Sequence, residues 1–252
     1  MWTIREVKER GKAAFKANFW RSVFVAFILT LCAGAAGAAS GSMGSNTIRQ
    51  ESGSEDNHID AEEFNTFLDN ELAKQGITLS DEDKQIMVGA VILVLLAVMG
   101  IAIVIGSIVR LLLFNPLAVG CNGFFLKNIE GEKDLDSMSL GFKHYGRNVL
   151  TMFLMQVFLT LWTMLFIIPG LIKLYSYRMV PYILAEDPDV GAVEAITRSR
   201  QIMKGNKWKA FVLDFSFIGW FILEALTLGI LGVFYVNPYY YSTDAALYEA
   251  IK

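Results

Sequence analysis

Charged residues are distributed very unevenly along this chain of 252 residues. Four long stretches hold at most two of them each: residues 22–48, 85–109, 148–172 and 210–243. The first three stretches contain no Asp, Glu, Lys or Arg, and the fourth contains only Asp214 and Glu224. About 20 apolar residues are enough for a helix to cross a bilayer. We therefore expect an all-α fold, a polytopic bundle of transmembrane helices that forms a single membrane domain over residues 1–252.

Composition supports a membrane protein and excludes several functional classes. Apolar residues make up 54% of the chain, charged residues only 19%, and the mean hydropathy is +0.43. No soluble segment combines a basic cluster with aromatic residues, so we expect no nucleic-acid partner. Cys32 and Cys121 lie in apolar stretches, as packing residues do. His58 and His144 are far apart, and no zinc-ligand spacing is present, so we expect no metal and no other cofactor.

The distribution of Lys and Arg predicts the orientation. Sixteen basic residues face the cytoplasm and three face the outside if the N-terminus is inside, which is a strong asymmetry under the positive-inside rule. The outer segment, residues 40–85, combines those three basic residues with eleven acidic ones, for a net charge of −8. We expect both termini in the cytoplasm. A signal peptide cleaved near residues 36–38 is the competing interpretation of the first stretch, although the charged region before it contains Glu6 and Glu9.

One pattern occurs three times: a basic segment, an apolar helix, and a returning apolar segment that contains a proline. The basic segments are an amphipathic elbow at residues 1–21, a connector at 127–147 and an interfacial helix at 187–205. The prolines are Pro116, Pro181 and Pro238, and each is expected to kink its segment. This pattern predicts six spans as three hairpins with cytoplasmic elbow helices. The alternative is that prolines are simply common in membrane helices.

Two of the predicted spans have an unusual length. Residues 171–185 are short, at roughly 23 Å of helix, whereas residues 86–126 are too long for one span. We therefore end the second span near Arg110 and expect the chain to bend along the inner face at Pro116. On the outer side, Pro169-Gly170 is expected to form the turn of the second hairpin.

Charged residues inside the predicted bundle are the candidate site. Arg178 and Asp214 both lie roughly 10 Å from the cytoplasmic face, on consecutive segments. A lone charge inside a bilayer costs on the order of 3 kcal/mol and needs a partner. We therefore predict that Arg178 and Asp214 face each other, with Lys173 and Glu224 forming a looser second layer nearer the outside. The pair either locks the second and third hairpins together or forms a polar site for a lipid headgroup or an ion.

The outer segment contains one partial motif. Residues 52–63 end like the calcium loop of an EF-hand, but Ser52 and Ser54 stand at its first and third positions, where carboxylates are expected. We therefore expect a solvated acidic loop that binds calcium weakly at most. Farther along, Ser80 followed by Asp83 predicts a capping box at the start of the second span.

The second half of the chain carries a set of short motifs. They are Ile168-Pro169-Gly170, Tyr175-Ser176-Tyr177, Pro181-Tyr182-Ile183-Leu184-Ala185, Glu194-Ala195-Ile196 with Ser199, Met203-Lys204-Gly205-Asn206-Lys207-Trp208, Ser216-Phe217-Ile218-Gly219-Trp220, Thr227-Leu228-Gly229-Ile230 and Pro238-Tyr239 with Tyr248. Over about residues 140–250 this set resembles a family of bacterial integral membrane proteins known as domain of unknown function 975. That family is more distantly similar to the membrane domain of some glycerophosphodiester phosphodiesterases. The resemblance implies a bacterial plasma membrane location and supplies no catalytic residues.

The sequence shows no paired carboxylates, no nucleophile beside a base and no phosphate-binding loop, so we expect no enzyme activity. We expect a non-catalytic membrane protein that acts as a scaffold, assembly factor or regulator, with membrane lipids and other membrane proteins as partners. The alternative is a transporter or lipid-handling protein with a polar intramembrane site. An intramembrane hydrolase is the third interpretation.

Overall fold

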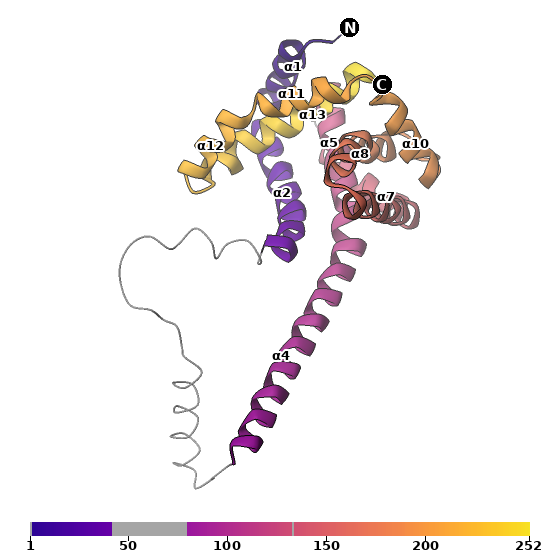
Figure 1. Cartoon of the computed structure of the whole chain (residues 1–252). Coiled ribbons are helices and arrows are strands. Elements are labelled where there is room, and N and C mark those ends of the chain that lie inside the picture. Colours follow the sequence, from indigo (N-terminus) through magenta and orange to yellow (C-terminus); the bar gives the residue numbers. More distant parts are fainter. Residues whose placement is uncertain (1, 42–79, 133) are drawn as a thin grey trace. The chain divides into compact units, whose positions relative to one another are not determined.

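The computed structural model describes residues 2–41, 80–132 and 134–252, and the regular secondary structure of these residues is helical, without strands (Figure 1). Contacts divide the chain into two units, residues 1–37 with 108–252 and residues 38–107. The EF-hand-like motif and most of the acidic outer segment lie outside the described residues.

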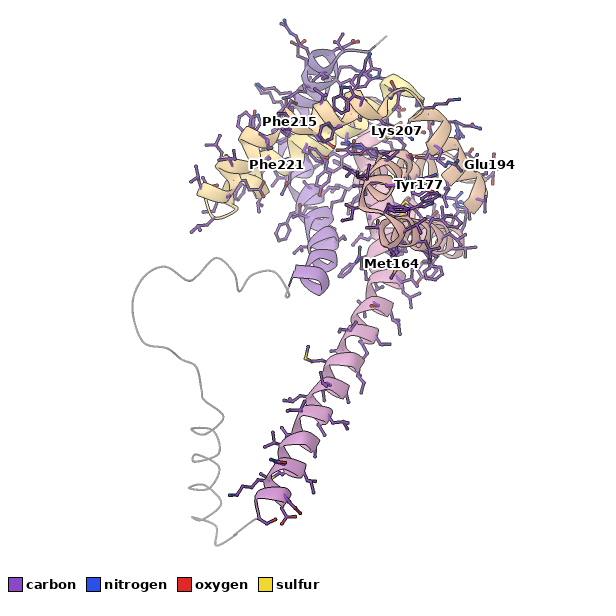
Figure 2. The ribbon with its side chains drawn as sticks, viewed as in Figure 1. Met164, Tyr177, Glu194, Lys207, Phe215 and Phe221 are labelled. Atoms are coloured by element: carbon purple, nitrogen blue, oxygen red, sulfur yellow. The ribbon has the colours of Figure 1, made fainter. Side chains whose placement is uncertain are left out.

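In the unit of residues 38–107, most of the described chain belongs to α4 (Asp81–Val109). The predicted capping box begins this helix: Ser80 Oγ donates to Asp83 Oδ2 at 2.8 Å and accepts from the backbone N–H of Asp83 at 3.3 Å. Residues 89–109 are all exposed although nearly all are apolar, and their side chains project from α4 (Figure 2). A helix that is apolar around its whole circumference fits a lipid environment.

Two helical runs are long and apolar enough to cross a membrane: Glu82–Ile129 and α7 (Tyr145–Leu165). The number is three if α1 (Ile4–Ala17) and the part of α2 (Phe19–Gly41) up to Cys32, which are bent by 108°, count as one span. The first run stays helical beyond Arg110, where the second span was predicted to end. It continues through a π-helical turn, η1 (Arg110–Phe114), into α5 (Asn115–Ile129), where Pro116 occupies the first turn.

The amphipathic elbow predicted at the N-terminus is α1. Thr3 Oγ1 caps it by accepting from the backbone N–H of Glu6 at 3.2 Å. One face is buried, and it consists of Val7, Gly11, Ala14 and Phe15. Gly11 approaches α13 (Asn237–Ile251) so closely that a Cβ added there would lie 2.6 Å from the Cα of Thr243. The apolar face of α1 therefore packs against protein.

A buried asparagine of α5 supports the sharp bend between α1 and α2. The side-chain amide of Asn128 donates to the carbonyl oxygen of Ala14 at 3.1 Å and to Ser22 Oγ at 3.3 Å, and its oxygen accepts from the amide of Asn18. These bonds join the end of α1 and the start of α2 to α5. The break at Asn18 is thus held by tertiary contacts as well as by the local sequence.

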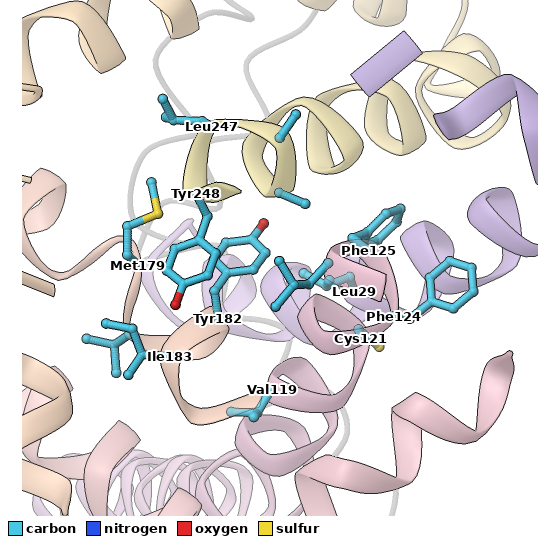
Figure 3. Close-up of a cluster of buried hydrophobic side chains, with 14 of the residues drawn as sticks. Leu29, Val119, Cys121, Phe124, Phe125, Met179, Tyr182, Ile183, Leu247 and Tyr248 are labelled. Carbon is cyan, nitrogen blue, oxygen red and sulfur yellow. The ribbon is translucent and has the colours of Figure 1, made fainter. Parts of the chain in front are cut away.

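Three helices with a proline in their first turn lie at the centre of the larger unit: α5, α9 (Val180–Glu186) and α13. The central helix α5 packs against both α9 and α13. Pro116 and Pro238 each follow a π-helical turn with one residue between, η1 for Pro116 and Gly232–Val236 for Pro238, whereas Pro181 follows the break at Arg178 and Met179. The three prolines that were expected to kink spans therefore stand where the regular α-helical pattern changes. Buried side chains between these helices include Val119, Phe125, Ile183 and Leu247 (Figure 3).

The connector at residues 127–147 also packs tightly against α5. It contains a 3-10 helix, η2 (Leu135–Ser139), and the short α6 (Leu140–Lys143). A Cβ on Gly120 would lie 2.0 Å from the carbonyl oxygen of Met138, and one on Gly141 would lie 1.9 Å from that of Pro116. Only glycine fits at these two positions.

The predicted span at residues 171–185 is interrupted, and so is the charge-poor stretch 210–243. Residues 171–185 divide between α8 (Ile167–Tyr177) and α9, with a break at Arg178 and Met179. Residues 208–226 divide between α11 (Lys207–Phe215) and α12 (Ile218–Leu226). Both breaks place polar or charged side chains at helix ends in the middle of an apolar segment.

Two predicted positions in the second half of the chain need correction: a turn and the start of a helix. The turn between α7 and α8 falls at the extended Phe166 rather than at Pro169-Gly170, because proline fits in the first turn of α8. The helix predicted from residue 187 begins later, as α10 (Ala192–Ile202). Asp187 does not cap it: Oδ1 accepts from the backbone N–H of Asp189 at 3.1 Å, and Oδ2 accepts from Arg198 at 3.2 Å.

Candidate functional site: an arginine between two carboxylates

The candidate site forms around Arg178, which stands at the break between α8 and α9. Its side chain is only 12% exposed. Because the chain leaves α8 at this residue, the guanidinium reaches across to both α11 and α13. An interrupted helix thus delivers a cation into the interior of the larger unit.

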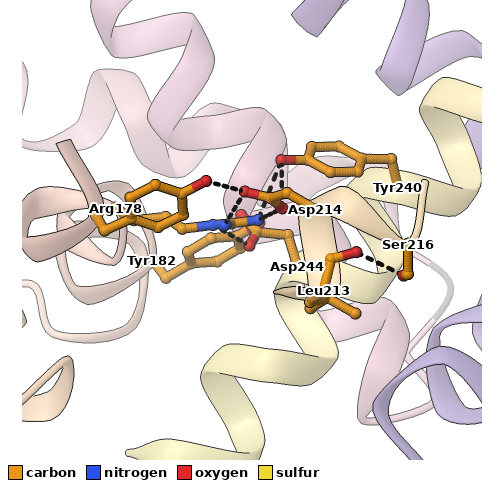
Figure 4. Close-up of polar contacts among 8 residues, drawn as sticks. Arg178, Tyr182, Leu213, Asp214, Ser216, Tyr240 and Asp244 are labelled. Carbon is orange, nitrogen blue, oxygen red and sulfur yellow. Dashed lines mark hydrogen bonds and ion pairs between the residues drawn. The ribbon is translucent and has the colours of Figure 1, made fainter. Parts of the chain in front are cut away.

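Asp214 of α11 binds one edge of the guanidinium. Arg178 Nη1 donates to Oδ2 at 2.8 Å and Nη2 donates to Oδ1 at 2.9 Å, so the contact is bidentate (Figure 4). Two tyrosines complete the coordination of this carboxylate: Tyr175 donates to Oδ2 at 2.8 Å and Tyr240 donates to Oδ1 at 3.1 Å. A bidentate pair of this kind is among the strongest hydrogen-bonded arrangements in proteins.

Asp244 of α13 binds the other side of the same guanidinium. Arg178 Nε donates to Asp244 Oδ1 at 2.6 Å, and the hydroxyl of Tyr182 donates to Oδ2 at 3.1 Å. The side chain of Asp244 is 12% exposed, compared with 23% for Asp214. We call Tyr175, Arg178, Tyr182, Asp214, Tyr240 and Asp244 the Arg178 cluster.

The Arg178 cluster connects four helices and leaves the guanidinium no free nitrogen. Nε, Nη1 and Nη2 all donate to acceptors of the protein, and Nη2 also donates to the hydroxyl of Tyr240 at 3.1 Å. One positive charge faces two carboxylates, so the fully ionised cluster carries one excess negative charge. Asp214 accepts four of the bonds and Asp244 accepts two, so most of the bonds in the cluster end on α11.

The structure brings together Arg178 and Asp214, which were predicted to be partners because they lie at the same distance from the cytoplasmic face. It does not bring together the predicted second layer. The ammonium of Lys173 lies 4.5 Å from the ring centroid of Trp162 on α7. The carboxylate of Glu224 packs against Gly232 in the π-helical turn η3 (Gly232–Val236), where a Cβ on the glycine would be 2.1 Å from Oε1.

Sequence reasoning missed Asp244 and the tyrosine ligands. Asp244 stands immediately after the charge-poor stretch 210–243 and was left outside it. A signal was present, because Tyr240 and Asp244 are four residues apart and so share one face of a helix. Tyr182 gives no such local signal, since its distance from Asp244 along the chain is 62 residues.

A second polar network holds the end of α9. Arg147 donates to the carbonyl oxygens of Leu184 and Asp187, both at 2.9 Å. Nearby, Glu186 accepts from Lys252 Nζ at 2.6 Å and from the hydroxyl of Tyr248. Burial acts to raise the pKa of Glu186, but the hydrogen bonds from Lys252 and Tyr248 outweigh it, so the pKa lies below its ordinary value.

Within the described residues, no three His, Cys, Asp or Glu side chains gather as a metal ion would need. The two described cysteines, Cys32 and Cys121, are free and buried. The Arg178 cluster itself consists of groups that donate or accept hydrogen bonds among themselves.

Comparison with known sequences identifies the family. The family described as "Protein of unknown function (DUF975)" matches residues 91–252, and the chain belongs to this family. The match covers the Arg178 cluster and all of the second and third predicted hairpins. No curated protein and no solved structure shows significant similarity to the chain.

Proposed function

We propose that this member of the DUF975 family is a multi-pass protein of the bacterial plasma membrane that acts without catalysis, as a scaffold, assembly factor or regulator. In this proposal six segments cross the membrane as three hairpins, and both termini are cytoplasmic. Exposed apolar side chains on α4, α7, α8 and α12 support the membrane placement. The interruptions of α8–α9 and α11–α12 then lie inside broken spans, where freed backbone groups need other partners. At the first break, the N–H of Met179 donates to Ser199 Oγ at 3.3 Å, and this hydroxyl donates to the carbonyl oxygen of Ser176 at 2.8 Å.

The single observation that carries the non-catalytic role is the set of four hydrogen bonds that Arg178, with its five N–H groups, donates within the protein. A guanidinium that holds a substrate or a transported ion directs its donors toward that ligand, whereas all but one of the N–H groups of Arg178 are directed at protein acceptors. This favours a lock between the second and third hairpins over a ligand site. A rigid bundle with amphipathic elbows is suited to binding other membrane proteins.

Topology is tested by labelling single cysteines on whole cells with an impermeant maleimide, in a chain whose two native cysteines are replaced. Ser54→Cys in the outer segment should react. Ser139→Cys should not, although Ser139 is exposed in η2. Labelling at Ser139 but not at Ser54 would reverse the proposed orientation.

The scaffold role is tested by affinity purification of the tagged full chain from native membranes after crosslinking. We expect one or a few membrane proteins at near-stoichiometric amounts. Phospholipid turnover by the purified protein, or substrate-dependent transport in liposomes, would refute a non-catalytic scaffold and support the hydrolase or the transporter.

A further inference from the structure

A groove runs between α8 and α11, next to the Arg178 cluster. Its volume is about 330 Å³, within the usual range for small-molecule sites. It is lined by Leu171, Ile172, Tyr175, Lys207, Trp208 and Phe211. Four of these side chains are strongly exposed: Trp208 at 72%, Leu171 at 50%, Ile172 at 49% and Phe211 at 37%. The groove is therefore open and apolar, and it lies on the surface of the larger unit.

One cation, Lys207, stands in the lining of the groove. Lys173 is outside the lining, with its ammonium over the ring of Trp162, but lies within electrostatic range of both Lys207 and Arg200. None of these three cations forms an ion pair among the described residues, whereas the neighbouring Arg198 is paired with Asp187. Residues 195–210 contain five basic residues and no acidic one.

The N-terminus of α11 adds to this positive potential. The helix begins at Lys207, no side chain caps it, and its first turn holds no acidic residue (Figure 2). The helix dipole places partial positive charge at such an end. The indole of Trp208 stands beside this helix end and stacks on Phe211, with ring centroids 5.3 Å apart. Tryptophan next to lysine is typical of the headgroup layer of a bilayer.

We propose that this groove binds an anionic phospholipid, with an acyl chain along the apolar lining and the phosphate at Lys207. The charge complementarity argues for this occupant: an apolar groove alone would take any lipid tail, but Lys207 in the lining, which forms no ion pair among the described residues, favours a negative headgroup. The proposal rests on the membrane placement argued above. It differs from a lipid site at Arg178, whose nitrogens are already occupied.

The lining links the groove to the Arg178 cluster. Tyr175 faces the groove and also donates its hydroxyl to Asp214. A lipid that packs against Tyr175 fixes this hydroxyl in place, so bound lipid stabilises the contact between α8 and α11. Lipid occupancy should therefore raise the thermal stability of the protein, as any ligand that binds only the folded state does.

The test uses the full chain in detergent micelles, with phosphatidylglycerol or phosphatidylcholine added and retention measured by native mass spectrometry. We expect phosphatidylglycerol to be retained more tightly than phosphatidylcholine. In Lys207→Gln, retention of phosphatidylglycerol should fall about five-fold, because that is the affinity that one lysine contact with an anionic lipid contributes. The matched control is Lys209→Gln. Lys209 lies on the same helix, but its Nζ is 5.6 Å from the ring centroid of Trp2. Its substitution should leave the retention of phosphatidylglycerol unchanged.

A second variant, Leu171→Trp, fills the groove without changing charge and should also reduce retention of phosphatidylglycerol. Equal losses of phosphatidylglycerol retention in Lys207→Gln and Lys209→Gln would show that the lipid responds to positive charge in general, and would refute binding in the groove. Equal retention of both lipids would overturn the anionic selectivity. Displacement by inorganic phosphate alone would show that the site holds a free anion and not a lipid. If the chain does not fractionate with membranes, the proposed function fails; if it does and only these lipid results fail, the groove proposal fails alone.

Discussion

The two carboxylates that bind Arg178 should respond very differently to neutralisation. In Asp214→Asn, one of the two oxygens becomes an NH₂ group, and either orientation of the amide points that group at an N–H of Arg178. The substitution removes one charge-assisted bond, worth about 1.5–3 kcal/mol, and weakens one bond from a tyrosine, worth about 1 kcal/mol. We expect a loss of about 3 kcal/mol of unfolding free energy, within the range for breaking a buried ion pair.

Asp244→Asn should cost less, although Asp244 is the less exposed of the two. The amide oxygen can keep the bond from Arg178 Nε, and the NH₂ group can donate to the hydroxyl oxygen of Tyr182 in place of the bond that this hydroxyl now gives. The change also removes the excess negative charge of the cluster. We expect a loss of about 1 kcal/mol or less, the net value of a single ordinary hydrogen bond.

The assay is unfolding of the purified protein in mixed micelles at pH 7 by increasing SDS, followed by circular dichroism. Asp187→Asn is the control, because the Asp187–Arg198 pair is 38% and 43% exposed and should contribute less than about 1 kcal/mol. The reasoning is refuted if Asp244→Asn costs as much as Asp214→Asn, or if Asp214→Asn costs no more than the control.

Three further predictions concern other parts of the chain. Gly11→Ala should lose about 2 kcal/mol of stability in the same assay, because the new methyl group overlaps the backbone of α13, whereas Gly219→Ala, with nothing within 4 Å, should not destabilise. Glu186 has a lowered pKa, so its bonds stabilise the fold above its unfolded pKa of about 4.3 and are lost as the pH falls through the lower folded value. Accordingly, the melting temperature in detergent should fall less between pH 5 and pH 3 in Glu186→Gln than in the native chain; equal slopes would contradict this role. A peptide of residues 44–78 should gain no helix by circular dichroism on adding micromolar calcium, since two ligand positions of its loop are serines.

The sequence by itself determined the features that depend on short-range patterns. Charge-free stretches predict apolar helices, and α4 and α7 are such helices. The N-terminal segment was predicted to be an amphipathic helix, and α1 has one buried face. The Ser80–Asp83 spacing predicts the cap of α4. Depth along two consecutive segments was enough to pair Arg178 with Asp214, because a charge in an apolar segment needs a partner at the same level.

Only the tertiary structure decided where the helices break and which groups share the site. A hydrophobic stretch such as 171–185 gives no local sign that it divides at Arg178, because the backbone groups at the break bond to Ser199, which is 20 residues from Met179 and 23 from Ser176 along the chain. The carboxylates that bind the Arg178 side chain are 36 and 66 residues away. The same holds for Tyr182, whose hydroxyl meets Asp244 because α9 and α13 both pack against α5. Local periodicity fixes which residues form a helix and which face is apolar, whereas the partners of a buried polar group depend on contacts between helices that no short-range pattern records.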